Sequence, residues 1–222
     1  MTLKARILEI GPYPPPGNGW AVRIAFVAEE IRRQGHQCVP LNTGERRRIP
    51  SPEYECVRSG REYLWKLMKY AAGGWLFHLH LNGHSPKGLL LAGLAAAVGT
   101  AAGKRPVLTF HGGALQTYFP KEHAGRYRRA YRLLFDVCRI ILCNNATVAR
   151  RIADFGVEPG KIVPILPFSR QYLAAKPDVA DPLLAQFLQD HAPVVAVYLE
   201  IRPDYAVDSL FDALKQVATD FP

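Results

Sequence analysis

The chain has 222 residues, of which 49% are hydrophobic, and it carries a formal net charge of +9. A chain of this length is long enough for one large core, or for one domain and part of a second. The first residues show no signal-peptide pattern, and the longest near-apolar stretch, residues 88–103, is too short and too rich in Ala and Gly for a membrane span, so we expect a buried helix there.

The start of the chain predicts a strand, a loop, a helix and a second strand. Residues 5–10 form a short apolar run, and residues 11–20 are too dense in Pro and Gly to continue a strand or a helix. Residues 21–33 place apolar side chains on one side at helical spacing, Gly35 follows where a left-handed cap is needed, and residues 36–41 are a second apolar run. Such a unit is right-handed and implies a parallel sheet.

The loop of this unit contains Gly17, Asn18 and Gly19. Glycines between a strand and a helix let backbone N–H groups approach an anion closely, although a tight connection stiffened by prolines is the alternative. A dinucleotide fingerprint would need a third glycine where Val22 stands, and the sequence has no Gly-Lys-Ser or Gly-Lys-Thr phosphate loop. An anion or sugar-phosphate site therefore remains open for this loop.

Strands and helices alternate through the next part of the chain, which predicts a Rossmann-like, doubly wound α/β fold with a parallel sheet. The expected helices span residues 62–72, 86–98 and 122–135, and a fourth runs from Asn144 or Asn145 to Phe155 and closes on Gly156. The expected strands span residues 75–81, 106–110, 139–143 and 161–166.

The alternation lapses near residue 170. We expect a domain over residues 1–170, a linker over 171–192 with a short helix near its end, and the start of a second Rossmann-like domain over 193–222. The last part predicts one strand at 193–199 and one helix at 208–218. One strand cannot make a sheet by itself, so we expect the sequence to be a fragment of a longer protein.

The charge changes sign at the same place. Residues 1–170 have a net charge of +14 and residues 171–222 a net charge of −5, which together give the overall +9. A basic domain suits nucleic acid, an anionic membrane surface or phosphorylated substrates. The four cysteines have no metal-ligand spacing, and we expect reduced thiols in a cytoplasmic protein.

Four polar stretches directly follow predicted strands: residues 17–19, 82–85, 111–113 and 144–145. Ligands of an open parallel sheet bind outside the carboxyl ends of the strands, so we expect these stretches to converge on one rim. The candidate rim residues are His84, Gly112, Gly113 and Asn144.

His111 is the strongest single candidate for a functional side chain. A strand ends at this residue on two glycines, which exposes the imidazole to whatever fills the cleft, although a structural histidine is the alternative. A hydrolase is disfavoured, because Lys87 stands where a nucleophile elbow needs glycine and the glycine-rich loop follows the serine. His78, His80 and His84 suggest a metal, but no fourth ligand is identifiable, and histidines on one face of a strand are usually packed and hydrogen-bonded.

Residues 126–132 interleave arginines and tyrosines on a predicted helix. A solvated helix face is the commoner outcome of such a pattern. Docking on an anionic membrane surface is the functional interpretation, since Tyr and Arg suit a headgroup layer. No recognised nucleic-acid module is present, so nucleic acid is disfavoured as a partner.

Several stretches match one enzyme family in their order and spacing. They are residues 7–15 and 17–20, residues 28–36, and residues 80–83, 107–113 and 144–157. Together they resemble the N-terminal, acceptor-side domain of a GT-B glycosyltransferase from the large retaining group called family 4. The resemblance spans nearly all of residues 5–170.

The resemblance implies two Rossmann-like domains that face each other across a cleft, of which the first mostly holds the acceptor and the second a nucleotide sugar. It places Gly17 and Gly19 near the donor diphosphate and the acceptor, and His111 against the donor sugar. Backbone N–H groups favour a departing diphosphate, and an imidazole can orient a sugar hydroxyl. No metal or other cofactor is expected.

The chain departs from the family pattern where the second domain begins. Members have Gly-Arg and then Glu-Lys-Gly there, whereas this chain has Leu199-Glu200 and Asp204-Tyr205-Ala206. Arg202 is the nearby candidate for a donor-phosphate ligand. Because a leaving diphosphate needs cations or aimed dipoles, we expect this stretch to lack most of a donor site.

The sequence thus favours a glycosyltransferase that moves a sugar from a nucleotide-sugar donor to an anionic or lipid-linked acceptor, with retention, at the cytoplasmic face of a membrane. The alternative is a non-catalytic α/β module that binds a glycan or a partner. A nucleic-acid binder is the third hypothesis.

Overall fold

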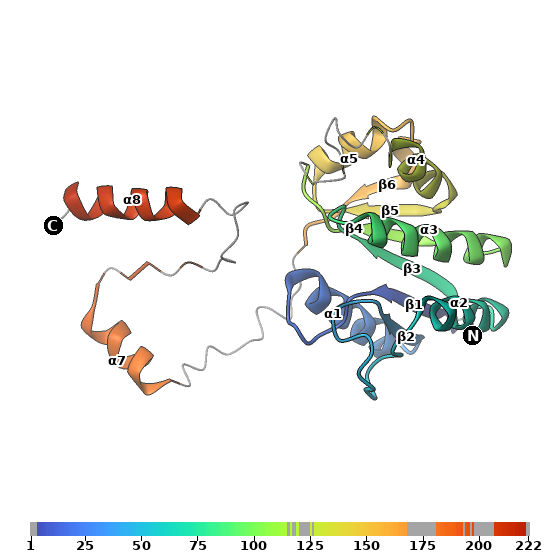
Figure 1. The fold of residues 1–222 in the computed structure, drawn as a ribbon, viewed down its shortest axis with the longest axis horizontal. Coiled ribbons are helices and arrows are strands. Elements are labelled where there is room, and N and C mark those ends of the chain that lie inside the picture. Colours follow the sequence, from blue (N-terminus) through green and yellow to red (C-terminus); the bar gives the residue numbers. More distant parts are fainter. Residues whose placement is uncertain are drawn as a thin grey trace. The chain divides into compact units, whose positions relative to one another are not determined.

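Six parallel strands in the order β2-β1-β3-β4-β5-β6 form the centre of the first part of the chain (Figure 1). The strands are β1 Arg6–Gly11, β2 Gln37–Asn42, β3 Leu76–Leu81, β4 Val107–Phe110, β5 Ile140–Cys143 and β6 Ile162–Pro164. The helices between them are α1 Gly19–Arg33, α2 Gly60–Ala72, α3 Pro86–Ala101, α4 Arg128–Val137 and α5 Ala146–Ala153, with a 3-10 turn at Pro159–Lys161. The doubly wound α/β fold predicted from the sequence is confirmed.

The structure is a computed structural model of the chain. The residues that it describes are 4–114, 116, 119, 125, 127–167, 181–192, 194–195, 197 and 207–220. The chain divides into two units, Met1–Ala174 and Ala175–Pro222, and the sheet belongs to the first.

Four helices cover one face of the sheet, and α1 covers the β1–β2 part of the other. Apolar side chains of α2, α3, α4 and α5 join those of one sheet face, such as Phe77 and Leu108, in one large core. Helix α1 packs on the other face, over β1 and β2. It lies so close that a Cβ added to Gly11 would sit 2.6 Å from Ile24 Cδ1. The side chains that alternate along β1 therefore meet two different environments.

The ends of the helices follow the predicted capping residues. Helix α1 ends before Gly35, which has the left-handed φ of +82° that glycine adopts without strain. Asn145, one of the two predicted candidates, caps α5 through its Oδ1. Helix α4 differs from the prediction: it begins at Arg128, after 3-10 turns at Gly125 and Tyr127, and it continues to Val137. Glycine is a poor helix former, which accounts for the later start.

The second unit contains two described helices, α7 Pro182–Asp190 and α8 Val207–Asp220. They agree with the helices predicted near 183–190 and at 208–218. The strand predicted at 193–199 falls largely outside the described residues, and so does Arg202.

Two features bear on the environment of the protein. Across the residues that the structure describes, no helix combines the length and the hydrophobicity that a membrane crossing demands. All four cysteines are free thiols. Cys138 is fully buried, and burial raises the pKa of its thiol to about 12, so this cysteine is inert near neutral pH.

Candidate functional site

A pocket lies where the strand order reverses. Strand β2 lies on one side of β1, while β3 to β6 follow on the other, and ligands of open α/β sheets bind at such a point, outside the carboxyl ends of the strands. The pocket has a volume of about 210 Å3. The ends of β1 and β3 and the first turns of α1 and α3 line it, including Pro12, Trp20, His80, His84 and Lys87.

The glycine loop leads directly into α1 beside this pocket. Asn18 caps the helix, because its Oδ1 accepts a hydrogen bond from Ala21 N at 2.9 Å. Neither Gly17 nor Gly19 has a left-handed φ, and a Cβ added to Gly19 would meet no heavy atom within 4 Å. Packing therefore does not require glycine at these positions, and the space beside the loop is open to a ligand.

His111 lies next to the start of α1. Its ring centroid is 5.6 Å from that of Trp20, in an edge-on arrangement. Asn144 Nδ2 donates a hydrogen bond to the His111 carbonyl at 2.8 Å, and Arg23 of α1 donates to Asn144 Oδ1 at 3.1 Å. The structure thus brings His111 and Asn144 together beside the first turns of α1, which directly follow the glycine loop.

The fourth stretch, after β3, forms the other side of the pocket. Ser85 caps α3, since its Oγ accepts a hydrogen bond from Gly88 N at 3.0 Å, and Asn82 Oδ1 accepts one from His84 N. The serine of the apparent nucleophile elbow is therefore a helix cap. His84 is exposed and lines the pocket.

Of the two glycines after β4, Gly112 has a structural reason to be glycine, whereas Gly113 meets only the end of a flexible side chain. A Cβ added to Gly112 would lie 2.5 Å from the Asn82 carbonyl oxygen, and one added to Gly113 would lie 3.3 Å from Gln116 Nε2. The connection after β4 thus packs tightly against the end of β3. Gly112 holds the rim together, which is a different role from contacting a ligand.

A buried carboxylate that the sequence reasoning missed lies beneath the rim. Glu9 of β1 is fully buried, and its two oxygens lie 2.9 Å from His78 Nδ1 and 2.5 Å from His80 Nε2. The signal was an acidic residue in the middle of an apolar strand, in register with His78. Burial raises the pKa of Glu9, but the charges and hydrogen bonds of both histidines lower it more, to about 2.

The same three residues bear on the metal hypothesis. Ligand atoms of Glu9, His78 and His80 all lie within 4.8 Å of one another. Each of the four ring nitrogens of His78 and His80 is, however, already within hydrogen-bond distance of Glu9, Thr109 or His111. His84, the third histidine of the sequence hypothesis, is not part of this group.

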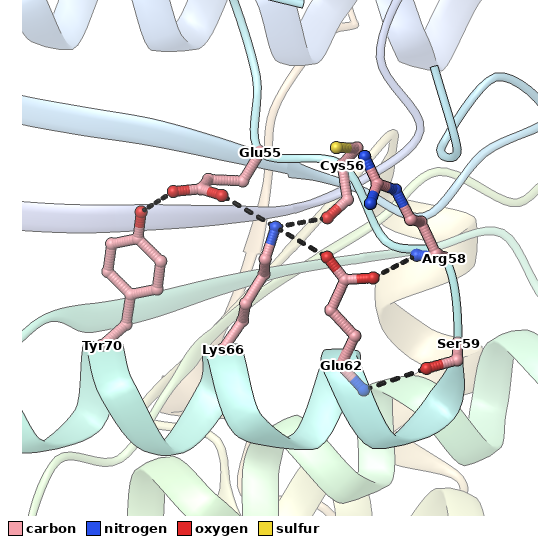
Figure 2. A network of polar contacts seen from close by, with 7 residues as sticks. All are labelled: Glu55, Cys56, Arg58, Ser59, Glu62, Lys66 and Tyr70. Carbon is pink, nitrogen blue, oxygen red and sulfur yellow. Dashed lines mark hydrogen bonds and ion pairs between the residues drawn. The ribbon is translucent and has the colours of Figure 1, made fainter. Parts of the chain in front are cut away.

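A network of ion pairs and hydrogen bonds holds the connection between β2 and α2 against helix α2 (Figure 2). The Lys66 ammonium of α2 lies 2.8 Å from Glu55 Oε2 and 3.3 Å from Glu62 Oε1, and it donates to the Cys56 carbonyl. Tyr70 donates to Glu55 from the next turn of the helix. The same connection contributes Thr43 and Gly44 to the pocket, and these two residues are held by hydrogen bonds to the Gly11 carbonyl and to Asn42 Oδ1.

The basic helix predicted at residues 126–132 corresponds to the start of α4, and Arg126 lies outside the described residues. Arg128, Arg129 and Arg132 are exposed. Helices α3 and α4 border an apolar groove of about 540 Å3 whose lining includes Leu90 and Leu133 but none of these arginines, and Arg128 donates a hydrogen bond to the Asp154 carbonyl instead. Leu90 is 71% exposed and Leu133 65% exposed.

Comparison with known proteins identifies the family of the chain. Residues 17–168 match the model of Glycosyltransferase Family 4. No curated protein matches the chain.

Three solved structures share the fold. The chain is similar to the crystal structure of a glycosyltransferase from Rickettsia africae ESF-5, with 14% identity and a TM-score of 0.52, over 86% of this chain and 51% of that one. It is also similar to Anabaena Alr3699/HepE in complex with UDP, with 14% identity and a TM-score of 0.59, over 95% of this chain and 57% of that one. The complex of the same protein with UDP and glucose gives 14% identity and a TM-score of 0.59, over 96% of this chain and 58% of that one. The chain thus spans about half the length of these proteins.

Proposed function

The chain belongs to glycosyltransferase family 4, and we propose that it is the acceptor-side part of an enzyme that transfers a sugar from a nucleotide-sugar donor with retention of the anomeric configuration. The observation that carries the proposal is the convergence of Trp20, His111 and Asn144 beside a pocket at the point where the strand order reverses. Three segments far apart in the sequence form one polar rim there.

The donor would approach the rim from the side of the glycine loop. The open space at Gly19 lets a diphosphate lie against the backbone at the start of α1, where the helix dipole favours negative charge. His111 would then contact the sugar of the donor. The relative that was solved with UDP and glucose supports a donor of this class. As in the family pattern, we expect transfer without a metal ion.

The acceptor would occupy the pocket between β1 and β3. Lys87 and the N-terminal turn of α3 contribute positive charge to this pocket, which favours an anionic group such as a phosphate. A lipid-linked acceptor would present such a group at a membrane surface.

The α3–α4 surface suits that location. Helix α4 carries exposed arginines, and it also forms one side of the apolar groove that contains Leu90 and Leu133. Cations and exposed leucines on one helix are a combination by which proteins bind the headgroup layer of an anionic membrane. We therefore propose peripheral docking on the cytoplasmic face through α4.

The donor site would be supplied largely from outside this stretch. Arg202 remains the candidate ligand for a donor phosphate, and we expect residues 1–222 alone to show little or no transfer. The alternative function is a non-catalytic module that binds a glycan or a partner, which the presence of a pocket lined by residues of the first unit favours.

A thermal-shift panel tests the class of ligand. We expect anionic phospholipid headgroups or sugar phosphates to raise the melting temperature of the 222-residue chain, because a ligand that binds only the folded state stabilises it. We expect nucleotide sugars to act more strongly on the longest product of the same gene. A panel in which no nucleotide sugar stabilises either protein would contradict the transferase.

A further inference from the structure

A row of polar side chains crosses the central strands beneath the rim. Glu9 of β1 is in register with His78 of β3, and Thr109 of β4 is in register with His80 of β3. All four are at most 8% exposed. A parallel sheet that is covered on both faces normally carries apolar side chains in its central strands, so four polar residues in adjoining positions need a reason.

The hydrogen bonds of this row lead to His111. His80 Nε2 lies 2.5 Å from Glu9 Oε2, and on the other side of its ring His80 Nδ1 lies 2.8 Å from His111 Nε2. The second Glu9 oxygen faces His78 Nδ1, and His78 Nε2 lies 2.7 Å from Thr109 Oγ1. A continuous chain of hydrogen bonds therefore connects a buried carboxylate to the rim.

The chemistry of these groups fixes the direction of each hydrogen bond. An ionised carboxylate only accepts, so His80 must donate through Nε2. Burial lowers the pKa of His80 to about 4, which keeps its ring neutral near pH 7 and leaves Nδ1 with a lone pair. His111 must then donate through Nε2, since the opposite tautomer would set two lone pairs against each other at 2.8 Å.

The surroundings of His111 keep its own ring neutral. Burial is the largest cause that holds the pKa of His111 well below its usual range, and the positive charge of Arg23 on α1 acts in the same direction. A neutral ring that carries its proton on Nε2 has its lone pair on Nδ1. Within the described part of the chain, His111 Nδ1 has no hydrogen-bond partner.

We propose that Glu9 is a positioning residue: through His80 it fixes His111 in the tautomer whose Nδ1 is a hydrogen-bond acceptor, so that His111 receives a proton-donating group of the substrate, a sugar hydroxyl. The inference that the bound hydroxyl belongs to a sugar rests on the proposed function. The inference about the tautomer of His111 does not, because it follows from contacts within the first unit. Such a ring would discriminate against a carboxylate at the same place, which has lone pairs but no proton to donate.

The alternative arrangements are costly. If His80 carried its proton on Nδ1, one oxygen of the buried Glu9 would lose its donor, and an unsatisfied buried charge is more expensive than an unsatisfied neutral group. If Glu9 were replaced by an apolar residue, no carboxylate would remain to select one tautomer of His80. The tautomer of His111 would then no longer be fixed.

The experiment is a ¹⁵N–¹H correlation spectrum of the 222-residue chain labelled on histidine, recorded near neutral pH, in which the loss of signals in His111→Gln assigns the ring. We expect wild-type His111 to carry its proton on Nε2 and not on Nδ1, with a scalar coupling across the hydrogen bond to His80 Nδ1. In Glu9→Met, we expect the ring signals of His111 to move toward those of mixed tautomers. Thr109→Val, which changes the same row at its far end, serves as the matched control and should leave His111 unchanged.

Two results would overturn the proposal. One is a wild-type His111 that carries its proton on Nδ1 or on both nitrogens. The other is an unchanged His111 tautomer in a folded Glu9→Met. If Glu9→Met does not fold, the wild-type tautomer and the coupling to His80 still decide, and absence of that coupling counts against the proposal. These readouts need no donor or acceptor, so they can fail while the transferase function holds, or hold while it fails.

Discussion

The indole of Trp20 meets the imidazole of His111 edge-on, with ring centroids 5.6 Å apart, although 91 positions separate them in the sequence. Trp20 stands in the first turn of α1 and His111 directly follows β4. The contact therefore joins the glycine loop to the opposite side of the rim, and it places His111 where a ligand at the start of α1 would be within reach.

Replacement of His111 by alanine should impair transfer more than folding. The imidazole is only partly buried, and its hydrogen bond to His80 is the one side-chain hydrogen bond described for it. We expect kcat to fall by about 100-fold, the usual cost of losing one preorganised polar group at a reacting centre. Steady-state kinetics on the longest product of the gene measure this. If the His111→Ala variant kept its activity, His111 would not be part of the active site.

Gly19→Ala should separate binding from stability. A Cβ at this position meets no heavy atom of the protein, so we expect an unchanged melting temperature but weaker binding of a nucleotide sugar, whose diphosphate needs the same space. Gly60→Ala is the matched control, because a Cβ there also meets nothing and the residue, which starts α2, is not in the lining of the pocket. Equal affinities in the two variants would contradict a ligand at the loop.

Acid should destabilise the fold through His80. Its pKa falls from 6.5 to about 4 on folding, so below pH 6.5 the unfolded chain binds more protons than the folded one. The free energy of unfolding should therefore fall by about 1 kcal/mol per pH unit between pH 6.5 and 4 from this group alone. Glu9 adds a loss in the same direction, from pH 4.5 down to about 2. Urea titrations at a series of pH values check the slope, which should become shallower between pH 6.5 and 4 in His80→Phe, while His111, whose pKa burial also lowers, supplies part of what remains.

Lys66→Met should destabilise the connection after β2. The Lys66 side chain is 9% exposed, and its ammonium pairs with Glu55 and Glu62, whose side chains are 32% and 27% exposed. Burial lowers the pKa of Lys66, but its two carboxylate partners raise it more, so the ammonium stays charged in the fold. Because the carboxylates keep contact with water, we expect a loss of about 2 kcal/mol, below the 3–5 kcal/mol of a fully buried pair. Chemical denaturation measures the loss, and the double variant with Glu55→Gln should recover part of it. An additive double variant would show that the pair is not coupled.

Membrane docking predicts a specific effect of α4. The charge reversal Arg129→Glu should weaken sedimentation with vesicles rich in anionic lipid, since each basic residue at such a surface contributes about 1 kcal/mol, or about fivefold in affinity. Arg150→Glu makes the same change in net charge on α5 and is the control. Equal losses in both variants would indicate non-specific attraction in place of docking through α4.

The sequence predicted what depends on local pattern. The apolar runs, the glycines at the helix ends and the alternation of strands with helices led to the observed sheet, and the carboxyl ends of the strands led to the rim. It did not predict that Ser85 and Asn18 cap helices or that Gly112 is fixed by packing, because these roles depend on neighbours across the sheet. The role of Glu9 could not be read from β1 alone, since its partners stand on β3, about 70 residues later.

The most direct test of the account is transfer of a labelled sugar from a panel of nucleotide sugars by the longest product of the gene, with the 222-residue chain and His111→Ala beside it. The account predicts a labelled product whose anomeric configuration is retained, its near-complete loss in His111→Ala, and little or no product from residues 1–222. UDP-glucose should be preferred over UDP-glucuronate if His111 receives a hydroxyl. Tight binding of a glycan without turnover of any nucleotide sugar would contradict the transferase and support the binding module, and robust turnover by the 222-residue chain would contradict a donor site that lies mostly outside it.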